Sequence, residues 1–243
     1  MKRSLSILFL LIFLGVGTAF AQEKTDSYDQ FIGEVVSYDV RSLAVKQADA
    51  NLEFKGLVEV GGRKAYLITF EAKGFNFLDI EKIYADKETF YPLRVERDLN
   101  IWGVAEKITE VYDQQNFIVT VTKTTKANSS PQVLAIQKKE EIDNIYCFIY
   151  RYRLNGDFKI GSSLKMNLPT KDVSIKIVKK TALEVGEKML DTIFLETTPA
   201  QYKIWFDVGS EKIPHRIDKT AMVGATSMII SNYSKGNSNG DAK

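Results

Sequence analysis

Short runs of alternating apolar and polar residues, separated by turn residues, repeat from Phe31 onward at a spacing of about ten residues. Tyr66, Ile68 and Phe70 fall on one face of one such run, as expected of a half-buried β-strand. Gly61-Gly62 precedes this run, and a Gly-Gly pair favours a hairpin because both central positions of a tight turn need a positive φ. We therefore expect a mainly β protein, with a curved antiparallel sheet or a half-open β-barrel or sandwich.

One segment, near residues 139–153, departs from this pattern. Its apolar residues recur at helical spacing, namely Ile142, Ile145, Tyr146 and Ile149. Acidic residues precede them, and Arg151 and Arg153 follow, which complements the helix dipole. Asn155-Gly156 then supplies a stop signal. The segment is predicted to be the one helix, although Tyr146, Phe148, Tyr150 and Tyr152 also alternate as they would in a strand.

The polar stretch from Lys126 to Gln132 predicts a loop that divides the chain into two unequal halves. Neither half shows caps or a linker of its own, so we expect a single β-rich domain over residues 31–234. Residues 22–30 are predicted to be an N-terminal linker. The Gly/Asn/Ser-rich residues 235–243 are predicted to be a flexible tail. The sequence leaves open whether the halves form one barrel or two packed sheets.

The first 21 residues have the order of parts of a secretory signal peptide. Lys2 and Arg3 form a basic head, Leu5 to Val16 form an apolar run, and Ala19-Phe20-Ala21 offers small residues at a cleavage site. The run is shorter than the roughly 20 apolar residues that span a bilayer. We expect cleavage near Ala21, a periplasmic or secreted location, and no transmembrane segment in the mature chain.

Charge and cysteine content limit the classes of partner. Lys2 and Arg3 account for the whole formal charge of +2, so the mature chain holds 31 basic and 31 acidic residues. This balance argues against nucleic acid, and against an anionic membrane surface as the main partner. Cys147 is the only cysteine, so no internal disulfide is possible, and its apolar neighbours favour an inert buried thiol.

The sequence shows no catalytic or metal-binding constellation. His215 is the only histidine, no Gly-x-Ser-x-Gly motif surrounds a serine, and one histidine with one cysteine cannot supply a zinc site. No dinucleotide or phosphate-loop fingerprint is present, so no cofactor is expected. A carbohydrate-active enzyme, which needs only two carboxylates, ranks third among the possible functions.

Several aromatic and basic residues are candidate ligand contacts, because exposed aromatic side chains beside a sheet mark a ligand mouth or a partner surface. The candidates are Phe75, Phe77, Trp102, Tyr150, Arg151 and Trp205. The alternative for the Trp102 ring is to fold back over the barrel end as a plug. Trp205 is expected to cover the outer face or to line a cavity. Arg94, Arg151 and Arg153 are candidate cations at a cavity rim, with solvated or helix-end positions as alternatives.

The order of motifs resembles a bacterial exported family called domain of unknown function 3108, over Phe31 to Tyr233. The motifs are Gly33 to Val40, Gly62 to Ile68, Tyr91 to Arg94, the tyrosine-rich segment ending at Arg151, Phe158 to Gly161, Lys203 to Asp207 and Ile213-Pro214. The resemblance implies an exported, mostly antiparallel β protein of unestablished activity, with no catalytic residues to carry over. By fold analogy it suggests the half-open β-barrels that shuttle lipids or lipoproteins across the periplasm.

These observations favour a non-catalytic carrier or binding protein for an apolar ligand such as a lipid. The alternative is an interaction or assembly module of the cell envelope, with a fully packed β-sandwich and a protein partner.

Overall fold

The computed structural model describes residues 27–43, 45–126, 128–221 and 224–236. The predicted signal peptide (1–21) lies outside the described residues, as do residues 22–26 of the predicted linker and residues 237–243 of the predicted tail.

Fourteen strands in the described part of the chain form one sheet, in which every neighbouring pair is antiparallel. They are β1 (Val35–Ser42), β2 (Val45–Val60), β3 (Arg63–Gly74), β4 (Phe77–Asp86), β5 (Pro92–Ile101), β6 (Val104–Asp113), β7 (Ile118–Thr125), β8 (Asn128–Gln137), β9 (Ser163–Asn167), β10 (Asp172–Val185), β11 (Lys188–Thr198), β12 (Tyr202–Asp207), β13 (Pro214–Ala221) and β14 (Gly224–Ser234). A 3₁₀ helix, η1 (Tyr28–Phe31), precedes β1, and one α-helix, α1 (Ile145–Asn155), follows β8.

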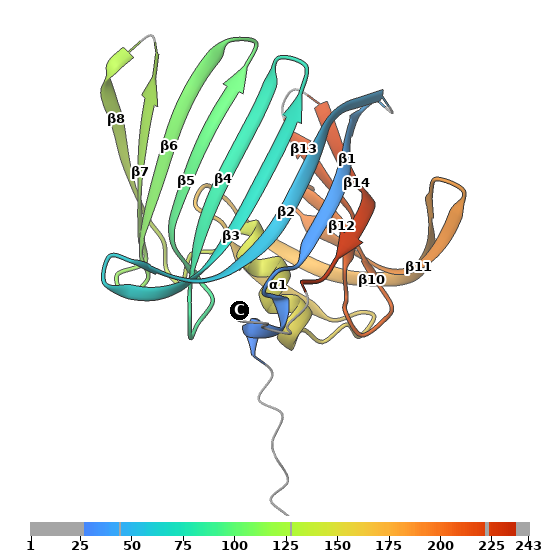
Figure 1. Ribbon diagram of the computed structural model, residues 1–243. Helices are drawn as coiled ribbons and strands as arrows, with labels where there is room; N and C mark the ends of the chain where they lie inside the picture. Colours follow the sequence, from blue (N-terminus) through green and yellow to red (C-terminus); the bar gives the residue numbers. More distant parts are fainter. Residues whose placement is uncertain (1–26, 44, 127, 222–223, 237–243) are drawn as a thin grey trace, which may run out of the picture.

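The first and last strands meet inside the sheet, where β1 pairs with β14. From this pair, neighbouring strands follow the chain outward in both directions until they reach the edges, β8 and β9. The segment that contains α1 connects these two edges, and Figure 1 shows α1 on the concave side, within the bend of the sheet. The two halves of the chain therefore share one open, curved sheet, which confirms the predicted fold class and excludes two separate packed sheets.

The core fills the space between α1 and the sheet. The alternation of β1 turns Val36, Tyr38 and Val40 inward, and β3 does the same with the predicted face of Tyr66, Ile68 and Phe70. Most residues of α1 are buried as well, because the curved sheet surrounds the helix on several sides.

The predicted helix is confirmed, but it begins at Ile145 rather than near residue 139. Asn144 is its N-cap, and its side chain accepts a hydrogen bond from the Tyr146 backbone N–H. The preceding residues make other bonds: the Asp143 N–H donates to the Asn167 carbonyl, and the Ile142 N–H donates to the Gln114 side chain. These long-range bonds hold the segment extended, which local periodicity does not reveal.

The predicted loop from Lys126 to Gln132 is wrong, because most of it belongs to β8. Asn128–Gln137 pairs with β7 in a hairpin, in which Thr125 lies opposite Asn128. β8 is an edge strand, and an edge tolerates both its polar residues and Pro131, whose missing N–H would interrupt an internal strand.

The described ends of the chain are attached to the domain. Residues 28–30, predicted to be linker, belong to η1, in which Tyr28 and Phe31 are buried. Lys235 forms an ion pair with Glu211, and the Gly236 N–H donates to the Gly33 carbonyl. Among the described residues, no helix is both long and apolar enough to cross a membrane.

Candidate ligand-binding cavity

A cavity of about 360 Å³ lies on the concave side of the sheet, beside the first turn of α1. One wall comes from β1, β3, β4 and β5, and the opposite wall comes from β12, β13 and β14. Its lining is mostly apolar and includes Phe70, Ala72, Leu99, Ile145, Ile217 and Met228. The cavity is partly open to solvent, since Ile101 and the exposed Lys219 also line it.

The cavity continues the core along the same strand faces. On β4, Phe77, Asp79 and Glu81 alternate into the cavity, and the next residue of that face, Ile83, is fully buried. On β5, Arg97 lines the cavity and lies opposite Glu81 in the register of the sheet. Each of these strands therefore packs against the core with one part of its inner face and lines the cavity with the next part.

A charged cluster lies within this apolar lining. Arg97 binds Asp79 through two hydrogen bonds, Nε to Oδ1 at 2.7 Å and Nη2 to Oδ2 at 2.5 Å. The Nε atom of Arg97 also lies 3.3 Å from Oε1 of Glu81. Asp79 is buried, so the bidentate pair supplies the partner that a buried carboxylate needs.

Burial changes the acidity of the cluster. Loss of solvent raises the pKa of Glu81 from its ordinary 4.5 to about 7, while Arg97 and Lys219 act in the opposite direction. Burial likewise raises the pKa of Glu110, whose carboxylate accepts a hydrogen bond from Tyr112. The cavity therefore offers an apolar lining with one group, Glu81, that changes charge near neutral pH.

None of the contact residues predicted from the sequence is Asp79, Glu81 or Arg97. The signal was available, because Asp79 and Glu81 alternate in phase with Phe77 and Ile83, and so occupy inward positions of a strand. A charged residue at an inward position needs a partner or a function, and both residues have Arg97 as their partner.

Of the six predicted contact residues, Phe77 lines the cavity. Phe75 and Trp102 lie instead at the tips of the β3–β4 and β5–β6 hairpins, where their rings are 6.1 Å apart in an edge-on contact. They are 83% and 71% exposed, so neither ring folds back as a plug.

Tyr150 and Arg151 do not line the cavity. Tyr150 is fully buried, and its ring makes edge contacts with Phe31 and Phe54 at 5.1 and 5.0 Å. Arg151 bonds both oxygens of Asp143, at 2.9 and 2.7 Å, and its guanidinium lies over the Tyr91 ring. Both residues therefore connect α1 to its surroundings.

Trp205 and Arg94 lie away from the cavity. Trp205 lies between buried residues of β12 that point inward, so it is on the outer face, with its ring 4.8 Å from Phe194 and with Arg216 above it. Arg94 forms a half-exposed ion pair with Glu96. Arg153 is buried and bound to Glu34.

Nucleophiles and metal ligands do not gather in the described residues. Cys147 is fully buried, and burial raises its thiol pKa, which is the inert state expected from the sequence. His215 is a half-buried residue of β13, and burial lowers its pKa. No group of three or more metal-ligating side chains occurs in the described part of the chain.

Comparison with solved structures identifies a protein of similar fold. It is a β-barrel-like protein of the domain of unknown function DUF1849 from Brucella abortus, with a TM-score of 0.53 and 7% sequence identity, over 86% of this chain and 99% of that one. At this identity the likeness concerns the fold alone.

Comparison with curated proteins gives no match. The family model described as "Protein of unknown function (DUF3108)" matches residues 37–231, which is most of the chain and includes every residue that lines the cavity. The chain therefore belongs to the DUF3108 family of proteins of unknown function.

Proposed function

We propose that this protein is a non-catalytic carrier or binding protein of the cell envelope, which holds an apolar ligand such as a lipid on the concave side of its sheet. The observation that carries the proposal is the cavity itself, lined by apolar side chains and containing the Asp79–Arg97–Glu81 cluster. Its volume of about 360 Å³ falls within the range of small-molecule sites, about 300–1,000 Å³.

The distribution of polarity in the cavity favours an amphipathic ligand. Phe70, Leu99 and Met228 offer apolar contact area, whereas Arg97 and Lys219 offer hydrogen-bond donors at fixed places. A ligand with an apolar body and an acidic or hydroxylated end satisfies both. The two carboxylates share one guanidinium, which favours a binding role over the separated acid and base of a glycosidase.

The proposed location follows from the sequence, since residues 1–21 have the composition of a signal peptide. A curved antiparallel sheet of this kind is also a common support for a ligand cavity.

The alternative function is an interaction module, and the exposed Phe75–Trp102 pair favours it. A fully packed sandwich, the form in which we expected such a module, is not what the chain adopts, because it has one sheet and a cavity.

The experiment that tests the carrier role combines extraction and dye binding. The purified full-length protein is extracted with organic solvent, and the extract is analysed by mass spectrometry for bound lipid. Nile red fluorescence then measures binding of an apolar dye to the same protein after delipidation. Lipid in the extract and saturable dye binding support the proposal, whereas an empty protein that does not bind the dye contradicts it.

Two variants locate the dye. Ala72→Phe fills the cavity and is expected to weaken dye binding at least tenfold, while Ala135→Phe, on the exposed edge strand β8, leaves it unchanged. Thermal unfolding of each variant shows whether the fold is intact. Equal dye binding by both folded variants places the dye elsewhere and contradicts a ligand site in the cavity.

A further inference from the structure

The hairpins along one end of the sheet present apolar side chains to solvent. Five hairpins turn at this end, and they are closed by the pairs Ser42–Val45, Gly74–Phe77, Ile101–Val104, Thr125–Asn128 and Ala221–Gly224. The register between neighbouring strands places adjacent hairpin tips at the same end, as the pairs Ala48–Gly74 and Phe77–Ile101 show. We define the hairpin rim as residues 41–43, 45–47, 73–77, 100–105, 123–126, 219–221 and 224–226. In Figure 1 these turns lie at the top.

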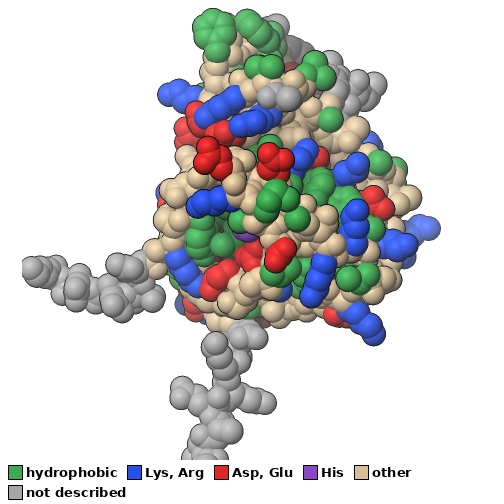
Figure 2. All heavy atoms as spheres, turned by 90° about the vertical axis from the view of Figure 1, so that its right-hand side faces the viewer, with side chains coloured by type: hydrophobic (Ala, Val, Ile, Leu, Met, Phe, Trp, Pro, Cys, Tyr) green, Lys and Arg blue, Asp and Glu red, His purple; other side chains and the backbone are tan. Residues whose placement is uncertain are grey.

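The three most exposed large apolar side chains of the described residues all belong to the hairpin rim. They are Leu43 (94% exposed), Phe75 (83%) and Trp102 (71%). Val45, Ile101 and Val104 add further exposed apolar surface on the same turns. Figure 2 shows hydrophobic side chains at this end of the molecule. An exposed apolar patch of this extent marks an interaction surface.

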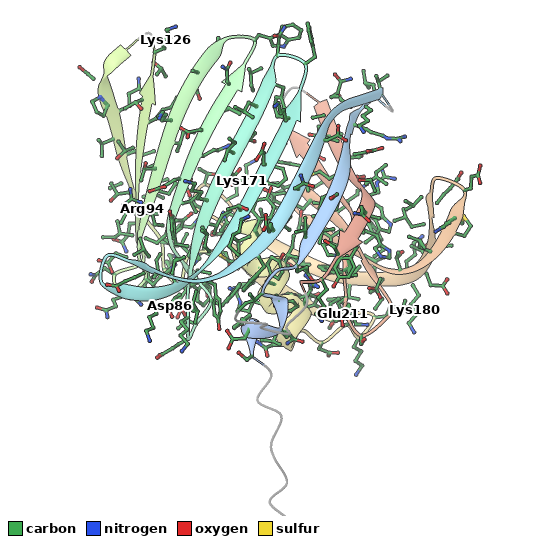
Figure 3. The ribbon with its side chains drawn as sticks, in the orientation of Figure 1. Asp86, Arg94, Lys126, Lys171, Lys180 and Glu211 are labelled. Carbon is green, nitrogen blue, oxygen red and sulfur yellow. The ribbon has the colours of Figure 1, made fainter. Side chains whose placement is uncertain are left out.

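The charges of the hairpin rim are of one sign. Its sequence contains six basic residues and no Asp or Glu; the basic residues are Arg41, Lys46, Lys73, Lys123, Lys126 and Lys219. The turns at the opposite end of the same strands carry charges of both signs, since Asp86, Glu88, Asp113 and Glu211 lie there with Arg63, Lys87 and Lys212. Figure 3 shows Lys126 at the rim end, with Asp86 and Glu211 at the other. The hairpin rim therefore differs from the opposite end of the sheet in lacking acidic residues.

Ion pairs offset three of these six basic charges. Lys46 binds Asp39 and Asp49, Arg41 binds Asp39, and Lys123 binds Glu106, and each of these acidic partners lies outside the rim ranges. Lys73, Lys126 and Lys219 form no ion pair within the described ranges and are exposed.

We propose that the hairpin rim docks on an anionic lipid bilayer, with Phe75 and Trp102 among the headgroups and the lysines facing the lipid charges. Aromatic side chains flanked by basic residues are the combination that binds at the interface of such a surface. The neutral net charge of the sequence argued against this partner, but the exposed Lys73, Lys126 and Lys219 give the rim a local basic surface that the net charge does not reveal. The cavity opens at the same end, since Ile101 and Lys219 belong both to its lining and to the rim. Transfer of a ligand between bilayer and cavity is a consequence that rests on the proposed function, whereas docking does not.

Vesicle flotation tests the docking. Full-length processed protein is expected to float with vesicles of mixed phosphatidylcholine and phosphatidylglycerol but not with phosphatidylcholine alone, and added salt weakens the binding. The double variant Phe75→Asp/Trp102→Asp abolishes binding, while Met189→Asp, at another exposed apolar site on the β10–β11 hairpin, does not. Lys126→Glu weakens binding about fivefold or more, whereas Lys180→Glu, far from the rim in Figure 3, leaves it unchanged.

Tryptophan fluorescence shows which face enters the lipid. Trp102 and Trp205 are the only tryptophans, so Trp205→Phe leaves a reporter on the rim and Trp102→Phe leaves one on the outer face. Brominated phosphatidylcholine in the mixed vesicles is expected to quench the first variant and not the second.

Each outcome decides the proposal separately from the carrier role. Absence of vesicle binding, equal binding to both vesicle types, or unchanged binding of the double variant overturns the docking. If the protein does not bind vesicles and the rim instead cross-links to another protein, the partner of the rim is a protein and not a bilayer. Ala72→Phe is expected to lose Nile red but keep vesicle binding, so a failed cavity and a failed rim give different results.

Discussion

Arg153 at the end of α1 and Glu34 before β1 form a buried bidentate ion pair, with Nη1–Oε1 and Nη2–Oε2 distances of 2.6 Å and side-chain exposures of 1% and 0%. Arg153 Nε also donates to the Glu211 carbonyl, and the Tyr233 hydroxyl donates to Glu34. The pair therefore joins the helix to the strands at the centre of the sheet. It holds in place the element whose first turn lines the cavity.

Removal of one partner of this pair is expected to be costly, because the other is left charged, buried and unpaired. Arg153→Met or Glu34→Gln should each lower the free energy of unfolding by about 3–5 kcal/mol, while the double variant recovers part of the loss. Urea denaturation of the two single variants and the double variant measures this. A loss below about 1 kcal/mol in both single variants would show that the pair is not the attachment of α1.

Removal of Arg97 from the cluster in the cavity should also lower the free energy of unfolding. Arg97→Met leaves Asp79 and Glu81 without their common cation, so we expect a loss of about 2–4 kcal/mol and weaker binding of acidic amphiphiles. The matched control is Arg94→Met on the same strand, whose half-exposed pair with Glu96 should contribute less than about 1 kcal/mol. Chemical denaturation compares the two, and equal losses would contradict a special role for Arg97.

Glu81 should make stability depend on pH. Its pKa is about 7 in the folded protein and near 4.5 in the unfolded chain, so between these values the folded state keeps a proton that the unfolded state has lost. Stability therefore falls as pH rises from about 4.5 to 7, by up to about 3 kcal/mol, and does not recover above that range. Glu81→Gln should flatten this part of the profile and stabilise the protein at pH 8. Thermal unfolding of both proteins across this pH range measures the effect. If stability falls with pH as steeply in the variant as in the original protein, Glu81 is not the group responsible.

Substitution of one phenylalanine in the core and one on the hairpin rim should affect stability very differently. Phe90 is fully buried and stacks on Tyr28 at 3.8 Å, so Phe90→Ala should cost about 3–5 kcal/mol. Phe75→Ala should change stability by less than about 0.5 kcal/mol, because the ring is already in solvent. Denaturation midpoints give the comparison, and a large loss for Phe75→Ala would mean that the hairpin tips support the fold.

The signal peptide predicts a defined mature N-terminus. Expression of the full sequence in a bacterial host should yield a periplasmic protein that begins at or near Gln22. N-terminal sequencing of the fractionated protein checks this. Retention of Met1 on a cytoplasmic product would remove the basis for the proposed envelope location.

Local patterns predicted most strands and the helix correctly, but they did not reveal the contacts with distant residues that fix where these elements begin and end. The alternation of Tyr66, Ile68 and Phe70 identified a strand face correctly, and the helical spacing around Ile149 identified α1. The polar composition of β8 was mistaken for a loop, because an edge strand needs no apolar face of its own. The helix start was placed too early, because bonds from Asp143 and Ile142 to distant residues hold that segment extended.

The candidate site was predicted least well, and for a physical reason. Of the aromatic residues predicted as ligand contacts, Phe77 lines the cavity, Tyr150 lies in the core, and Trp205 is on the outer face, one of the two positions expected for it. Asp79, Glu81 and Arg97 become a cluster because β4 and β5 pair in one register. Spacing along one strand reveals an inward charge, but not the residue that neutralises it.

The sequence by itself determined the class of fold, the family and the expected route of export, because alternation, turn residues and the apolar leader are local properties of the chain. Tertiary structure alone decided that β1 pairs with β14, that Arg153 meets Glu34, and that the cavity and hairpin rim share one end of the sheet. Those relationships join residues far apart in the chain, and they depend on strand register and curvature, which no local pattern encodes.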